Sequence, residues 1–146
     1  MKVADVMTRD VVAVDPTSSL LEALKKLKKS RVNGLVVLEG RRIVGVITKA
    51  DIFRAILPSY LDLVEDERYL TDPEFAEERV GRLLSVRVEE IMTPSPLTIG
   101  SEAPIVKAGA IMVARKIKQM PVVEGGELVG IVTLTDILDR LAGKYL

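Results

Sequence analysis

The sequence contains no histidine, cysteine or tryptophan, and only two phenylalanines and three tyrosines. Without histidine or cysteine, the chain lacks the groups for a Ser-His-Asp or Cys-His nucleophile, a disulfide, or a zinc or iron–sulfur site with the usual ligands. Any metal would have to be a hard cation bound by carboxylate or carbonyl oxygens. The few aromatic rings, and 21 Lys and Arg balanced by 21 Asp and Glu, argue against nucleic-acid binding.

Long hydrophobic runs are also missing. The most apolar helical stretch, residues 103–114, is interrupted by Lys107, and no run approaches the roughly 18 residues that indicate a membrane span. The first five residues carry no signal-peptide hydrophobic region. We therefore expect a cytoplasmic protein without membrane association. Its 146 residues fit one compact domain or two small ones that share a core.

An internal repeat is the most informative feature of the sequence. Shifted by 85 residues, the chain matches itself without a gap: Val6-Met7-Thr8 aligns with Ile91-Met92-Thr93, and Gly45–Asp51 aligns with Gly130–Asp136. This pattern divides the chain into a first repeat (1–57), an insert (58–86) and a second repeat (87–146).

Each repeat has the pattern of a β-α-β-β-α unit. In the first repeat we expect strands over 11–14, 35–38 and 43–47, and helices over 18–29 and 48–57. In the second repeat the first helix is expected to begin at Pro104, because proline suits a first helical turn. One such unit is too small to bury both faces of its sheet. We therefore predict an α+β fold in which the tandem repeats pack sheet to sheet with pseudo-two-fold symmetry.

The ordered motifs resemble those of the CBS domain, and two such domains in tandem resemble the pair known as a Bateman module. The resemblance is carried by the two Met-Thr motifs, by Met120-Pro121-Val122-Val123, and by the Gly-x-x-Thr-x-x-Asp segments that begin at Gly45 and Gly130. It covers the chain except for the insert and the last few residues.

The resemblance implies a regulatory sensor and not an enzyme. CBS pairs typically bind AMP, ADP, ATP or S-adenosylmethionine in two clefts between their repeats, and two pairs usually associate into a disc-like homodimer. Because the pair accounts for most of the 146 residues, we expect no effector domain in this chain. The signal would therefore pass to a separate regulated protein.

The Thr-x-x-Asp motifs have two interpretations. They are Thr48 with Asp51 and Thr133 with Asp136, each at a strand-to-helix junction. As capping boxes, they would satisfy free backbone amides of the first helical turn. As ligand residues, each aspartate would accept hydrogen bonds from ribose hydroxyls, while the threonine and the helix amides face a phosphate.

The family pattern implies that each repeat completes the adenine site of the other. The nucleotide bound by Asp136 would contact Thr8, Val12, Val32 and Asn33, and the one bound by Asp51 would contact Thr93, Leu97, Ile117 and Lys118. The apolar members of these sets have core packing as an alternative role. Relatives often place histidine or arginine at the phosphate, where this chain has only Asn33 and Lys118. AMP or ADP is therefore favoured over ATP.

The insert carries a strong negative charge. It is expected to form a short acidic helix over 60–67 and a second helix over 75–84, preceded by a Thr71-Asp72-Pro73-Glu74 start signal. Eight acids against three arginines give it a net charge of −5, so the remainder carries +5, partly in Lys25–Lys29. One interpretation is that both are solvated faces. The alternatives are docking of the insert on the basic surface, or hydrated Mg²⁺ at the acids.

Three functional hypotheses follow from these patterns. The first is an adenosine-nucleotide sensor that acts by conformational change. The second is a scaffold with empty clefts that works by dimerisation and partner docking, and that would expose an apolar patch. The third is an enzyme, which is disfavoured because no nucleophile–base pair is present.

Overall fold

The computed structural model describes all residues from 1 to 146 and groups them into two compact units. The C-terminal unit consists of Met1–Val11, Glu39–Val44 and Ser95–Leu146. The central unit consists of Val12–Leu38 and Gly45–Pro94. Packing therefore assigns residues 1–11 to the unit that holds most of the second repeat.

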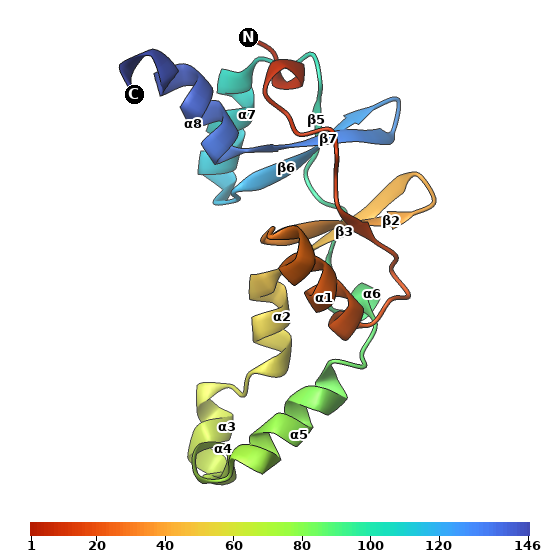
Figure 1. The fold of residues 1–146 in the computed structure, drawn as a ribbon, viewed down its shortest axis with the longest axis vertical. Coiled ribbons are helices and arrows are strands. Elements are labelled where there is room, and N and C mark those ends of the chain that lie inside the picture. Colours follow the sequence, from red (N-terminus) through yellow and green to blue (C-terminus); the bar gives the residue numbers. More distant parts are fainter. The chain divides into compact units, whose positions relative to one another are not determined.

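The C-terminal unit has a three-stranded sheet with two helices. Its elements are η1 (Val3–Asp5), β5 (Ile99–Gly100), α7 (Ile105–Arg115), β6 (Gln119–Glu124), β7 (Glu127–Thr133), α8 (Leu134–Ala142) and η2 (Gly143–Tyr145). The strand order is β5-β6-β7, with β5 parallel and β7 antiparallel to β6. Helices α7 and α8 contact each other (Figure 1), and Met112, Met120, Val132 and Ile137 lie in the buried core.

The central unit repeats this plan and adds the insert. Its elements are β1 (Ala13–Val14), α1 (Leu20–Ser30), β2 (Gly34–Glu39), β3 (Arg42–Thr48), α2 (Lys49–Ile56), α3 (Tyr60–Glu65), α4 (Arg68–Thr71), α5 (Pro73–Leu83), α6 (Val88–Ile91) and β4 (Thr93–Pro94). The sheet order is β1-β2-β3-β4. The predicted α+β class and the two β-α-β-β-α patterns are confirmed.

Local sequence explains the helices of both repeats. Ser19 caps α1 by accepting a hydrogen bond from the Glu22 amide at 3.1 Å, and Leu20, Ala23 and Leu27 bury one face at helical spacing. The start at Pro104 was predicted one position too early: Pro104 is the N-cap, and α7 begins at Ile105. Its ψ of 141° is extended, so the helical hydrogen-bonding pattern starts one residue later.

The opening segment of each repeat packs outside its own repeat. Val3 is buried in the core of the C-terminal unit, and its amide donates to the Ala103 carbonyl at 2.8 Å. Val88, its counterpart 85 residues on, is buried in the central unit and donates to the Ser18 carbonyl at 2.8 Å. The β-α-β-β-α prediction missed these segments because their partners are remote in the sequence.

The opening segments also add strand pairing at each sheet. Thr8 forms an antiparallel bridge with Ile131, and β4 pairs antiparallel with β3. Gly45 and Gly130 lie at these contacts: a Cβ added to Gly130 would lie 2.9 Å from the Thr8 carbonyl oxygen, and one added to Gly45 would lie 2.9 Å from the Thr93 carbonyl oxygen. The glycine of each Gly-x-x-Thr-x-x-Asp motif therefore admits the opening segment of the other repeat.

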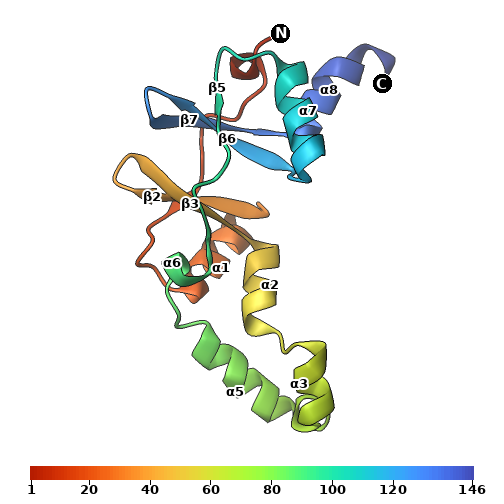
Figure 2. The same ribbon diagram turned by 180° about the vertical axis from the view of Figure 1, so that it is seen from behind.

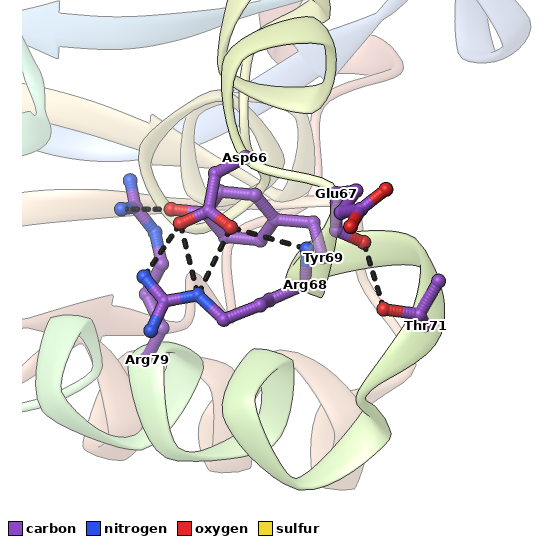
Figure 3. Close-up of polar contacts among 6 residues, drawn as sticks. All are labelled: Asp66, Glu67, Arg68, Tyr69, Thr71 and Arg79. Atoms are coloured by element: carbon purple, nitrogen blue, oxygen red, sulfur yellow. Dashed lines mark hydrogen bonds and ion pairs between the residues drawn. The ribbon is translucent and has the colours of Figure 1, made fainter.

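The insert forms a helical arm that leaves α2 through α3 and α4 and returns through α5 to α6 (Figures 1 and 2). The predicted helices are confirmed, as α3 and as α5 with Pro73 in its first turn. At the turn between them, Arg68 binds the Asp66 carboxylate, and Arg79 donates to the Tyr69 hydroxyl (Figure 3). The Arg68 guanidinium also lies 4.1 Å from the centre of the Phe75 ring.

Candidate functional site

The first Thr-x-x-Asp motif forms a complete capping box at the start of α2. The Asp51 amide donates to the Thr48 hydroxyl oxygen at 3.2 Å, and the Thr48 amide donates to Oδ2 of Asp51 at 2.9 Å. The Thr48 hydroxyl lies 3.1 Å from the same oxygen. Asp51 is buried, with 8% of its surface exposed. The capping interpretation of this pair is therefore confirmed.

The second motif forms the same box at the start of α8. The Asp136 amide donates to the Thr133 hydroxyl oxygen at 3.0 Å, and the Thr133 amide donates to Oδ2 of Asp136 at 3.1 Å. Asp136 is only half-buried. Because each carboxylate uses Oδ2 for the cap, Oδ1 is the oxygen through which it can bind another group.

Arg54 distinguishes the two boxes and was missed by the sequence reasoning. Its guanidinium pairs with Oδ1 of Asp51, while 71% of the Arg54 side chain remains exposed. The equivalent position in the second repeat, 85 residues on, is Asp139. The sequence could have indicated this ion pair, because side chains three residues apart on a helix are neighbours and an Asp–Arg pair at that spacing is attractive.

The other predicted site residues occupy equivalent places in the two units. The Asn33 carbonyl accepts a hydrogen bond from the Lys49 amide at 2.9 Å, and the Lys118 carbonyl accepts one from the Leu134 amide at 3.0 Å. Asn33 and Lys118 therefore lie beside the starts of α2 and α8, with exposed side chains.

The predicted contacts of each nucleotide are divided between the units. Within the C-terminal unit are Thr8, Leu97, Ile117, Lys118, Thr133 and Asp136, and within the central unit are Val12, Val32, Asn33, Thr48, Asp51 and Thr93. Among the predicted adenine contacts, Leu97 is 42% exposed, whereas Val12, Val32 and Ile117 are half-buried. Ile117 packs against the core cluster of its unit, which fits the alternative role of core packing.

A cavity of about 570 Å³ lies in the central unit between α1 and α2. Its apolar lining includes Leu24, Ile52 and Phe53, and its charged lining includes Lys28 and Arg31. None of the predicted ligand residues lines it. The cavity is therefore a separate feature from the two capped aspartates.

No group of three or more acidic side chains converges as a metal ligand set. No helix combines the length and the apolar character that spanning a bilayer requires.

Two β-α-β-β-α copies, each with an aspartate capping box at its final helix, define a tandem-repeat protein. The chain belongs to the CBS domain family, which matches residues 3–58 and 88–143. It is similar to the protein MJ1426 of Methanocaldococcus jannaschii, with 30% identity across 97% of this chain and 91% of that protein. It is also 36% identical to the inosine-5′-monophosphate dehydrogenase of Korarchaeum cryptofilum over 90% of this chain. That match spans only 22% of the dehydrogenase.

Solved structures share the fold. Protein MJ1225 of Methanocaldococcus jannaschii matches with a TM-score of 0.79 and 28% identity, over 97% of this chain and 48% of that one. CBSX2 in complex with AMP matches at 0.76 and 25% identity, over 99% and 98%. The CBS domain pair of protein MJ0100, in complex with 5′-methylthioadenosine and S-adenosyl-L-methionine, matches at 0.73 and 26% identity, over 99% and 98%.

Proposed function

We propose that this protein is a regulatory sensor of adenosine nucleotides, with one ligand bound at Asp51 and another at Asp136. The observation that carries the proposal is the duplicated box, which directs a carboxylate Oδ1 away from the cap at the start of α2 and again at the start of α8. A carboxylate at this place can accept hydrogen bonds from a ribose diol, and the positive end of the helix dipole favours a phosphate. The AMP and S-adenosyl-L-methionine complexes of similar CBS pairs support this ligand class.

Each site is proposed to be completed by the opposite repeat. Thr8, Val12, Val32 and Asn33 would serve the nucleotide at Asp136. The nucleotide at Asp51 would be served by Thr93, Leu97, Ile117 and Lys118. Aliphatic side chains would cover the adenine ring, and exposed polar groups would meet the phosphate. The small number of cations favours AMP or ADP over ATP.

The proposed output is a conformational change read by a separate protein. A ligand that contacts both repeats stabilises the arrangement in which both sets of contacts form, and it shifts the population toward that arrangement. Catalysis is not part of the proposal, because the boxes offer no nucleophile–base pair.

Ligand-dependent stabilisation tests this function. A ligand that binds only the folded protein, at 100 times its dissociation constant, adds about 2.7 kcal/mol to the free energy of unfolding. We expect AMP or ADP to raise the melting temperature, and calorimetry to count two sites. Asp51→Asn and Asp136→Asn should each remove one site, because the amide keeps the size of the carboxylate but loses its charge. The proposal fails if AMP, ADP, ATP and S-adenosylmethionine all leave the melting temperature unchanged.

A second candidate function is a dimerising scaffold, and exposed apolar side chains support it. Val106 and Val113 lie seven residues apart on α7, and Leu138 and Leu141 lie three apart on α8, so each pair shares one helix face. Their exposed fractions are 62%, 68%, 63% and 44%. A second copy of the chain is the proposed partner of this surface, which we call the α7/α8 apolar face. The scaffold predicts a stable dimer that no nucleotide stabilises further.

A further inference from the structure

The two capping-box aspartates differ in the groups that already bind their carboxylate oxygens. Both use Oδ2 to accept the backbone amide of the capping threonine. At Asp51, the Arg54 guanidinium takes Oδ1 as well. At Asp136, no cation of the same unit pairs with the carboxylate. The candidate one turn further along α8, Arg140, instead directs its Nε to the Met1 sulfur at 3.2 Å.

The surrounding charges differ in the same sense. Helix α2 contains Lys49, Asp51 and Arg54 as its charged residues, which gives a net charge of +1. Helix α8 contains Asp136, Asp139 and Arg140, which gives −1. The Lys118 carbonyl accepts a hydrogen bond at the start of α8. Adding the positive charge of Lys118 to the −1 of α8 gives a net charge of zero. The start of α2 therefore favours an anion more than the start of α8 does.

We propose that Arg54 makes binding at Asp51 depend on a phosphate, whereas Asp136 accepts adenosine ligands with or without one. The inference rests on the proposed function and names the ligand class of each site. A neutral ribose diol that binds Oδ1 of Asp51 must displace Arg54 and leave its guanidinium without an anion. A phosphate on the same ligand gives the guanidinium a new anionic partner.

The exposure of Arg54 makes this exchange feasible. Because 71% of its side chain is exposed, the guanidinium can leave Asp51 without the large penalty of breaking a buried pair. The Asp136 site has no ion pair to break, and Asp139 offers a phosphate no attraction. Uncharged or sulfonium-bearing adenosines therefore bind at Asp136 without a competing cation.

Calorimetry with AMP and adenosine, on variants that retain one site, tests the inference. In the Asp136→Asn protein only the Asp51 site remains, and we expect AMP to bind about three- to fivefold more tightly than adenosine, the upper part of the range for an exposed charge pair. In the Asp51→Asn protein, the two ligands should bind with affinities within about twofold of each other, since no comparable pair is gained or broken.

Substitutions at the distinguishing positions should move the preference between sites. In the Asp136→Asn background, Arg54→Gln should lower the AMP-to-adenosine affinity ratio to what Lys118 alone supplies, and Arg54→Lys should retain the full preference for AMP. In the Asp51→Asn background, Asp139→Arg should create that preference. Far-ultraviolet circular dichroism and thermal melting establish that each variant is folded.

The possible failures are distinguishable. If the unsubstituted protein binds none of AMP, ADP, ATP, adenosine and S-adenosylmethionine, the proposed function itself is wrong, and the inference falls with it. If both single-site proteins bind AMP but show equal affinity ratios, or if Arg54→Gln leaves the ratio at Asp51 unchanged, only the inference is overturned.

Discussion

At the residue scale, the same aspartates stabilise the fold and are proposed to bind ligand. Each carboxylate closes a capping box, and loss of a helix cap costs about 1 kcal/mol. A binding defect in an alanine variant could therefore come from a frayed helix. Asparagine is the better substitution, because its amide oxygen can still accept the hydrogen bond from the threonine amide.

Gly130 lies where the opening segment of the first repeat packs closely against β7. A Cβ at this position would lie 2.8 Å from the Met7 sulfur and 2.9 Å from the Thr8 carbonyl oxygen, and the backbone oxygen is fixed by its bridge to Ile131. We expect Gly130→Ala to lower the free energy of unfolding by about 1–3 kcal/mol, the usual cost of overpacking. Urea denaturation measures the change.

Gly81 provides the matched control. It lies in α5, and an added Cβ would have no neighbour within 4 Å. Gly81→Ala should raise the stability by up to about 1 kcal/mol through the better helix propensity of alanine. If both substitutions shift the denaturation midpoint equally, close packing at Gly130 is not what distinguishes them.

At the element scale, the helical arm depends on carboxylates held in their charged form. The Ser59 amide and hydroxyl lower the pKa of Asp62, and the side-chain and then the backbone hydrogen bond from Arg68 lower the pKa of Asp66. A pKa that is lower in the folded state means that folding favours the charged form. The resulting stability is present above the range where aspartate ordinarily titrates, and it is lost as pH falls through the lowered values.

The arm should therefore lose protection in acid. We expect hydrogen-exchange protection factors in α3 and α4 to decrease as the pH is lowered below the ordinary aspartate titration range. In the Asp62→Asn/Asp66→Asn protein they should decrease less steeply. Glu77→Gln is the control, because Glu77 lies exposed on α5 without an ion pair. A pH dependence that is identical in the double variant and the unsubstituted protein would contradict the role of these two carboxylates.

At the scale of the whole molecule, the α7/α8 apolar face is the surface proposed to associate with a second copy. Burying one large aliphatic side chain contributes about 1.5–3 kcal/mol. Leu138→Glu removes that contribution and introduces a charge that would have to be desolvated. We expect it to weaken a dimer at least about tenfold, as measured by sedimentation velocity over a concentration series.

The control for this surface lies on the arm. Val64 on α3 is 66% exposed, so Val64→Glu makes a comparable change from an aliphatic side chain to glutamate at similar exposure in the other unit. We expect it to leave the sedimentation coefficient unchanged. A monomer at all concentrations in the unsubstituted protein, or equal effects of both substitutions, would rule out this face as the dimer contact.

Much of the fold was predictable because its signals are local and occur twice. The helix-start residues Ser19, Thr48 and Thr133 act within four residues of their own positions, and apolar spacing distinguishes helices from strands. The roles of Thr48 and Asp51 as a capping box followed from the same rules. The proposed contacts to adenine do not follow in this way, because they depend on residues from different parts of the chain.

The sequence by itself determined the duplicated β-α-β-β-α plan, the helix boundaries to within about two residues, and the two aspartate boxes. These features depend on hydrogen bonds and burial patterns that span a few residues. Only the tertiary structure decided that Val3 packs with the second repeat and Val88 with the first, and that Arg54 occupies Asp51 while Asp136 has no such cation in its unit. The physical reason is that packing partners and side-chain rotamers are chosen by competition among groups brought together in space, which residue order does not rank.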